Sequence, residues 1–376
     1  MFDLRQAFTW LSGGRLIAAD PGEPSLVLTG VSTDTRAVRP GELFVALRGE
    51  RYDAHDFLGT AIAAGAAAVM VERWTTECRV PVLWVADTRR GLAEIAAGWR
   101  RRHVLPVIAV TGSNGKTTVK EMIAAILAAH VGDEARLSTR GNLNNDIGVP
   151  LTVMRLSDAH RAAVIELGMN QPGEIARLAA VAQAGVALVN NAQREHQEFL
   201  GTVEATAREN GEAIAALAAD GIAVFPGDDV HAPIWRELAG PRRTIEFGTA
   251  PGCAVRAEPD AQPDGFEMTI EGMPLRVSIA IDGAHNVRNA LAAAACCHAI
   301  GVPGATIAAG LAAFRPAAGR LRRLRASSGA ALIDDSYNAN PDSVRAAIDV
   351  LAAAPSPRLL VLGDMGEVGQ QGPHFH

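Results

Sequence analysis

The chain has 376 residues, of which 48% are hydrophobic, and it carries a formal net charge of −6. This length and composition allow two or three domains with buried cores and exclude a disordered chain. The net negative charge, without a basic stripe, argues against nucleic acid as a partner.

Residues 1–87 predict a small mixed α/β domain. A turn-like run at residues 32–36 precedes a strand expected at 42–47, and a polar loop follows at 48–57. From residue 88, near-continuous apolar runs alternate with helical patterns, which is typical of a parallel, doubly wound sheet. The apolar runs lie at residues 104–110, 162–167, 186–189 and 222–225.

The pattern changes after residue 250. Residues 251–281 combine turn residues with short β stretches and predict an antiparallel flap, and residues 282–289 open an Ala-rich helix that reaches about residue 299. A third domain is expected from residue 316, with strands at 330–335 and 358–362 and a helix capped by Asp342 or Ser343. Two strands and one helix rarely close a core, so we expect this domain to be incomplete.

Targeting and cysteine signals indicate a cytoplasmic protein. The N-terminus lacks the basic-then-apolar order of a signal peptide. The longest apolar stretch, residues 61–71, is too short to span a membrane, so no membrane insertion is expected. The cysteines lack Cys-x-x-Cys spacing, which predicts neither a zinc site nor a disulfide framework and fits a reduced compartment. They are Cys78, Cys253, Cys296 and Cys297.

The segment 107–118, VIAVTGSNGKTT, predicts a strand, a glycine turn and a helix. Glycines let backbone N–H groups approach an anion, and the helix N-terminus adds its positive dipole end. Lys116 is then expected at the β- and γ-phosphates and Thr117 at Mg²⁺. Val110 stands where the strict phosphate-loop pattern has its first glycine. The alternative is an ordinary strand–helix turn with a solvated lysine.

Other polar residues follow expected strand ends, where ligands bind in open α/β sheets. Glu166 is a candidate oxygen ligand of Mg²⁺ or an ordinary loop acid, and His196 is a functional or a solvated loop histidine. Asn286 and Asn289 share a helix face and either read a base edge or cap the helix. Asp335, beside Asp334, is a candidate for a ribose hydroxyl, for Mg²⁺ or for capping. The loop at 141–150 suits hydrogen bonds to a peptide or phosphate, or simple turn chemistry.

Together these segments resemble the Mur ligases, ATP-dependent amide-forming enzymes of cell-wall synthesis. Residues 111–118 resemble the family's phosphate loop, 285–289 its adenine-side motif, and Gly319-Arg320 its hinge-side pair. Within the family, the most similar members are those that add D-alanyl-D-alanine to UDP-N-acetylmuramoyl-tripeptide. The segments that carry this similarity are 141–152, 166–175, 335–343 and 362–369.

The resemblance implies a three-domain α/β architecture. A UDP-sugar-binding domain at 1–87 is followed by a central ATP-binding domain at 88–315 and an incomplete, Rossmann-like C-terminal domain at 316–376. It also implies ligation through an acyl phosphate, with ATP and Mg²⁺ as cofactors, UDP-N-acetylmuramoyl-tripeptide and D-alanyl-D-alanine as substrates, and a monomeric protein. Two alternatives stay open: a folylpolyglutamate-type amide ligase, and a truncated chain that binds ATP and the UDP precursor without turnover.

The resemblance also implies site residues. Catalysis falls to Lys116, Glu166 and His196, and metal binding to Thr117, Glu166 and His196. The implied ATP-binding residues are Thr111, Gly112, Ser113, Asn114, Gly115, Lys116, Thr117, Thr118, Asn286, Asn289, Arg320 and Asp335. The implied substrate-binding residues are Thr33, Asp34, Arg36, Gly49, Arg51, Asp53, His55, Phe57, Asn142, Asn144, Asn145, Asn338, Asn340, Asp364 and Met365.

One family feature is missing. The family's carbamoylated lysine lies in a helix that matches residues 204–212, where this chain has Arg208 and Asn210. The only lysines are Lys116 and Lys120. We therefore expect catalysis without a carbamate. Either a single metal suffices, or a carboxylate such as Glu209 or Glu212 replaces the carbamate, or Arg208 supplies positive charge directly.

Overall fold

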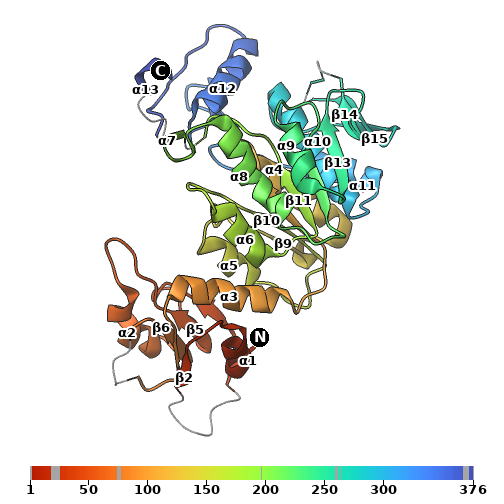
Figure 1. The fold of residues 1–376 in the computed structure, drawn as a ribbon. Helices are drawn as coiled ribbons and strands as arrows, with labels where there is room; N and C mark the ends of the chain where they lie inside the picture. Colours follow the sequence, from red (N-terminus) through yellow and green to blue (C-terminus); the bar gives the residue numbers. More distant parts are fainter. Residues whose placement is uncertain are drawn as a thin grey trace. The chain divides into compact units, whose positions relative to one another are not determined.

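The computed structural model describes residues 2–17, 26–73, 78–195, 197–258, 261–262, 264–366 and 372–375 (Figure 1). The chain forms two compact units. The first comprises Met1–Val104, Arg140–Asp158 and Ala180–Gln183, and the second comprises Leu105–Thr139, Ala159–Ala179 and Ala184–His376. Among the described residues, no helix combines the length and apolar character that crossing a bilayer requires.

The first unit is built on a five-stranded sheet in the order β2-β7-β6-β5-β4. Strands β4 to β7 pair in parallel, while β2 pairs antiparallel with β7. The expected strand at 42–47 forms β5. The strands are β2 (Arg15–Ile17), β4 (Gly30–Ser32), β5 (Glu42–Val45), β6 (Ala68–Val71) and β7 (Val82–Trp84), with a separate antiparallel pair of β1 (Phe2–Asp3) and β3 (Val27–Leu28). The helices are α1 (Leu4–Trp10), η1 (Ala54–Phe57), α2 (Leu58–Ala63), α3 (Thr88–Arg100) and α5 (Gly148–Val153).

The second unit contains a nine-stranded sheet in the order β16-β15-β14-β13-β12-β11-β8-β10-β9. All pairs from β9 to β14 are parallel, and β14–β15 and β15–β16 are antiparallel. Both the parallel sheet and the antiparallel flap are therefore confirmed. The strands are β8 (Val107–Thr111), β9 (Arg136–Ser138), β10 (Ala162–Glu166), β11 (Val186–Val189), β12 (Ile222–Pro226), β13 (Arg243–Gly248), β14 (Val255–Ala257), β15 (Phe266–Ile270) and β16 (Met273–Val277).

Helices cover both faces of this sheet. Alternate strand residues point to opposite faces, so Val224 lies in the core cluster that α4, α10 and α11 share, whereas Phe225 packs its ring against Trp235 of α9. Figure 1 shows α8 and α9 side by side over the sheet. The helices are α4 (Lys116–Val131), η2 (Asp133–Ala135), α6 (Glu174–Ala182), α7 (Gln197–Leu200), α8 (Val203–Ala215), α9 (Ala232–Ala239), α10 (Ala284–Ala299) and α11 (Gly304–Ala313).

The strand order places a switch point at β8. The chain leaves β8 through α4 to β9 and β10 on one side, then crosses to β11 on the other side of β8. The loops that follow β8, β10 and β11 therefore meet at the carboxyl ends of three neighbouring strands. In open α/β sheets, this is where ligands bind.

The C-terminal segment holds a two-stranded antiparallel sheet and two helices, where two expectations prove wrong. Residues 358–362 form no strand, and Leu359 and Val361 are 83% and 86% exposed. An apolar run becomes a strand only beside a partner, and the described strands here pair only with each other. The cap of α12 is Asn340, because Pro341 occupies the first helical position. The elements are β17 (Arg322–Arg325), β18 (Ala331–Asp334), α12 (Pro341–Ala353) and α13 (Gly372–Phe375).

Candidate functional site

The loop after β8 has the shape of an anion cradle. Gly112 and Gly115 have φ angles of +127° and +79°, which residues with a side chain rarely adopt. A Cβ on Gly115 would lie only 2.7 Å from Asn289 Oδ1, so the site itself requires glycine there. Helix α4 begins at Lys116 without a side-chain cap, which leaves its first N–H groups for a ligand.

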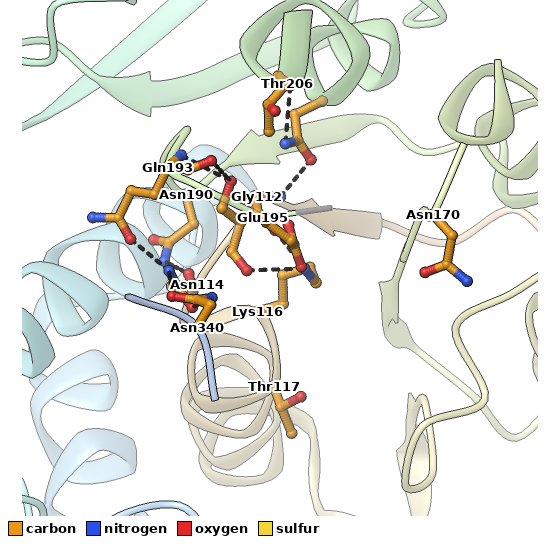
Figure 2. A network of polar contacts seen from close by, with 12 residues as sticks. Gly112, Asn114, Lys116, Thr117, Asn170, Asn190, Gln193, Glu195, Thr206 and Asn340 are labelled. Carbon is orange, nitrogen blue, oxygen red and sulfur yellow. Dashed lines mark hydrogen bonds and ion pairs between the residues drawn. The ribbon is translucent and has the colours of Figure 1, made fainter. Parts of the chain in front are cut away.

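Lys116 lies at the centre of this loop. Its ammonium donates to the carbonyl oxygens of Gly112 and Ser113 at 2.6 and 3.1 Å, and to Glu195 Oε1 at 2.7 Å (Figure 2). The side chains of Lys116 and Glu195 are only 13% and 12% exposed. The lysine is therefore not the solvated residue of the alternative interpretation.

Two side chains with oxygen atoms, Thr117 and Glu166, lie close together at the start of α4. The Thr117 hydroxyl donates to Glu166 Oε1 at 3.2 Å, and Glu166 is 2% exposed at the end of β10. The Glu166 N–H donates to the Thr139 hydroxyl at 2.9 Å, which fixes the end of the strand. A hydroxyl and a carboxylate side by side are the oxygen ligands that Mg²⁺ prefers. Among the described residues no group of three acidic, histidine or cysteine side chains is arranged for a metal, and His196 lies outside the described residues.

A network of amides closes around the phosphate loop (Figure 2). Asn190 Nδ2 donates to the Asn114 carbonyl at 2.8 Å and to Asn289 Oδ1 at 2.9 Å. Asn114 Nδ2 donates to Gln193 Oε1 at 2.6 Å, and Asn340 Nδ2 donates to Asn114 Oδ1 at 2.8 Å. The loop after β11, the helix α10 and the start of α12 are thereby joined to the phosphate loop.

The paired asparagines of α10 do share a face. Asn289 Nδ2 donates to Asn286 Oδ1 at 2.8 Å, and both residues are buried. Asn286 also donates to the Asp282 carbonyl at 2.6 Å, four residues before it. Asn286 therefore binds the backbone at the start of its helix, while Asn289 faces the phosphate loop.

A cavity of about 410 Å³ lies between these segments and the residues around Arg320 and Asp335. Arg320 stacks its guanidinium 4.1 Å from the Tyr337 ring centre, and its buried Nε has no hydrogen-bond partner among the described residues. Asp335 Oδ1 accepts the Leu321 N–H at 3.0 Å, and burial raises the pKa of its carboxyl. The cavity is lined by these predicted residues: Asn114, Gly115, Thr118, Asn286, Asn289, Arg320, Asp335 and Asn338.

The predicted UDP-sugar residues of the first unit form two local clusters. Arg36 binds Asp34 through two nitrogens, which lowers the pKa of Asp34 to about 2. Asp53 Oδ1 lies 2.5 Å from His55 Nδ1, and its other oxygen accepts Arg73 Nη2 at 2.5 Å.

The remaining predicted residues of this unit do not join either cluster. Gly49 donates its N–H to the Tyr52 carbonyl, Arg51 is exposed and Phe57 is 43% exposed. Thr33 is half-buried beside Asp34.

The loop at 141–150 shows ordinary turn chemistry: Asn145 Oδ1 accepts the N–H groups of Ile147 and Gly148 where α5 begins. Asn142 is exposed and Asn144 is half-buried.

Of the described C-terminal residues predicted to bind the dipeptide, two lie at the site and two do not contact it in the structure. Asn338 lines the cavity, and Asn340 both caps α12 and reaches the phosphate loop. Asp364 is exposed and Met365 is 6% exposed.

The structure adds contacts that the sequence did not indicate. Asn210 Oδ1 accepts the Gly112 N–H at 2.8 Å, and Glu209 accepts the N–H groups of Gly173 and Ile175 at the start of α6. Arg208 is instead an exposed partner of Glu204. Asn190, Gln193 and Glu195 also contact the loop from about 80 residues away in sequence. Their only signal is a position just after an apolar strand.

Comparisons with known proteins agree with this geometry. Three family models match: the Mur ligase middle domain over residues 110–297, the Mur ligase glutamate ligase domain over 319–376, and the Mur ligase family catalytic domain over 27–100. UDP-N-acetylmuramoyl-tripeptide–D-alanyl-D-alanine ligase of Escherichia coli is 41% identical over 98% of this chain and 80% of its own length. The enzyme of that name from Haemophilus influenzae is 38% identical over 94% of this chain and 78% of its own length.

Solved structures show the same similarity. The crystal structure of MurF from Acinetobacter baumannii matches with a TM-score of 0.92 at 35% identity, over 100% of this chain and 81% of that one. MurF from Thermotoga maritima in complex with ADP matches with a TM-score of 0.82 at 28% identity, over 93% and 81% of the two chains. The predicted three-domain α/β architecture is thereby confirmed, while the predicted domain boundaries stay predictions. On these matches and on the site geometry, the chain belongs to the Mur ligase family of ATP-dependent, amide-forming enzymes.

Proposed function

We propose that this chain ligates D-alanyl-D-alanine to UDP-N-acetylmuramoyl-tripeptide at the expense of ATP, in the synthesis of peptidoglycan precursors. The observation that carries the proposal is the phosphate cradle at the end of β8, where Lys116 and the Thr117–Glu166 pair lie at one edge of the sheet. The relatives at 41% and 38% identity bear the name of this ligase.

The chemistry requires an activated acid. A carboxylate cannot expel oxide, so the terminal carboxylate of the tripeptide takes the γ-phosphoryl group of ATP and becomes an acyl phosphate, with ADP leaving. The amine of D-alanyl-D-alanine then attacks the acyl carbon. A C–N bond forms, the C–O bond to phosphate breaks, and the amine loses a proton as inorganic phosphate departs.

The chain's own residues position and neutralise the phosphates. Lys116 and the N–H groups at the start of α4 balance the negative charge of the transferring group, which is the main catalytic requirement in phosphoryl transfer. Thr117 and Glu166 would hold Mg²⁺, which supplies charge neutralisation when bound, and we infer that His196 is a third ligand. Asn289, Arg320 and Asp335 line the same cavity and are assigned to the base, a phosphate and the ribose of ATP.

The two acceptor substrates are assigned by the resemblance. The UDP group is placed at Thr33, Asp34, Arg36 and the loop 49–57, and the precursor's peptide or phosphate at Asn142, Asn144 and Asn145. The dipeptide is placed at Asn338, Asn340, Asp364 and Met365. We also propose a monomer that works in the cytoplasm.

The direct test is phosphate release with each substrate omitted in turn. Release should require ATP, UDP-N-acetylmuramoyl-tripeptide and D-alanyl-D-alanine together. L-Glutamate with a folate in place of the two acceptors should give no release. Lys116→Ala should abolish release without unfolding the protein, because its ammonium has no substitute in the loop. Phosphate release that does not depend on D-alanyl-D-alanine, or an unchanged rate in Lys116→Ala, would refute the proposal.

A further inference from the structure

Glu195 occupies the position where a phosphate charge would be expected. An ammonium has three N–H donors. Those of Lys116 point to the Gly112 carbonyl, the Ser113 carbonyl and Glu195 Oε1, so none is left for a nucleotide (Figure 2). A phosphate that binds Lys116 must therefore replace one of these partners.

Only one of the three partners can leave without altering the cradle. The two carbonyls belong to the phosphate loop itself, and Gly112 is further fixed because its N–H donates to Asn210. Glu195 is a side chain that can rotate away. A carboxylate and a phosphate are both anionic acceptors, and in a site where Glu195 is only 12% exposed their repulsion is weakly screened.

The backbone is held at the two residues that precede Glu195. The Gln193 N–H donates to the Ser113 hydroxyl at 2.9 Å. Arg194 binds Asp342, in the first turn of α12, through its backbone N–H at 3.0 Å and its Nε at 3.1 Å. These contacts fix the backbone from which the Glu195 side chain reaches Lys116, while the side chain itself can still rotate.

We propose that Glu195 is an internal substitute for phosphate. It neutralises Lys116 while the site is empty, keeps the lysine drawn into the loop, and is displaced when the nucleotide arrives. Its negative charge therefore weakens nucleotide binding. This inference rests on the proposed ATP site and assigns to Glu195 the control of that site's affinity.

The test is the affinity for ADP, measured by isothermal titration with the 376-residue chain, with Mg²⁺ and with EDTA. Glu195→Gln keeps the size of the side chain and removes its charge, so ADP should bind about tenfold more tightly under both conditions. Glu195→Asp keeps the charge but moves it away from Lys116 by one methylene, and should give a smaller increase in ADP affinity. Glu198→Gln, the same charge change at an exposed position in α7, serves as the matched control and should leave the affinity unchanged.

A second readout separates this role from a structural one. Glu195→Gln should lower the melting temperature of the ligand-free protein and enlarge the rise that ADP produces, because the nucleotide then restores a missing partner of Lys116. Equal or weaker ADP binding in Glu195→Gln, or in Glu195→Asp if the first variant does not fold, overturns the inference. Weakening only with Mg²⁺ also overturns it, since Glu195 would then be a cation ligand. If the unsubstituted chain binds no ADP, the proposed function fails instead.

Discussion

Asp335 combines a half-buried position with a proposed role in binding. Partial burial raises the pKa of its carboxyl above the ordinary range of an aspartate, while one oxygen accepts the Leu321 N–H. An acid whose pKa is higher in the folded state than in the unfolded state stabilises the fold at pH values below its unfolded-state pKa. This contribution is lost as the pH rises through its folded-state pKa. At neutral pH, the ionised Asp335 therefore weakens the fold.

Asp335→Asn should accordingly raise the free energy of unfolding at pH 7, because an amide oxygen keeps the hydrogen bond to Leu321 without a partly desolvated charge. The gain should vanish as the pH falls well below the ordinary pKa of an aspartate, where the native carboxyl is protonated in both the folded and the unfolded state. Denaturant unfolding of the two proteins across pH 3–8 measures this. A destabilised variant at pH 7 contradicts the prediction, and weaker ADP binding in the variant would support the assignment of Asp335 to the nucleotide.

Among single residues, the sequence predicted the site residues that belong to a local motif. It missed those that are distant in sequence and reach the phosphate loop only because two strands lie side by side. Lys116 and Thr117 follow a glycine turn, so their positions could be predicted from local geometry. Glu195 could not, because its contact depends on β11 lying beside β8. The Asn340 cap was misassigned, although Pro341 carried the signal: a proline suits the first helical position and places the cap one residue earlier.

The crossing of α4 and α11 shows how tightly the helices of the second unit pack. A Cβ on Gly310 of α11 would lie 2.4 Å from the Cα of Ile126 in α4. Because the obstacle is backbone, neither helix can accommodate the added methyl by turning a side chain. The crossing therefore depends on glycine at this one position.

Gly310→Ala should lower the free energy of unfolding by about 1–3 kcal/mol, the usual range for overpacking, or by more if the helices cannot separate. Gly304→Ala in the same helix is the matched control, since its nearest neighbour would lie at an ordinary 3.8 Å. This control should be neutral or stabilising by up to about 1 kcal/mol. Guanidinium unfolding of both variants gives the comparison, and equal stabilities would show that the crossing is loose.

In the second unit, the strands that are buried on both faces of the sheet were predicted well. The strands β8, β10, β11 and β12 read as apolar runs because both faces of the sheet are covered by helices. The strand expected at 358–362 failed for the opposite reason. Its residues have the composition of a strand, but strand formation requires hydrogen bonds to a neighbour, which composition cannot predict.

Across the whole molecule, the scarcity of lysine restricts the chemistry available. Lys116 is committed to the phosphate loop, and Lys120 is fully buried and paired with Glu121. In α8, where the family resemblance implies a carbamoylated lysine, Glu209 binds two backbone N–H groups and Asn210 a third. Arg208 has no nucleophilic amine to offer because its guanidinium stays protonated.

The ligation rate should therefore not depend on dissolved CO₂. Phosphate release would be measured in CO₂-depleted buffer and again after addition of bicarbonate, at constant pH and ionic strength, with sodium chloride as the control salt. The expected result is the same rate in both. Activation by bicarbonate beyond the sodium chloride control would show that one of the two lysines forms a carbamate after all.

The amide network around the phosphate loop bears on how the site responds to pH. Asn114, Asn190, Gln193, Asn289 and Asn340 join four segments of the second unit through groups that neither gain nor lose a proton in water near neutrality. This amide part of the site thus presents the same donors and acceptors in an acidified cell as in a neutral one. Any change in nucleotide affinity that accompanies a change of pH must therefore come from the ionisable side chains that line the cavity beside these amides, such as His285 and Asp335.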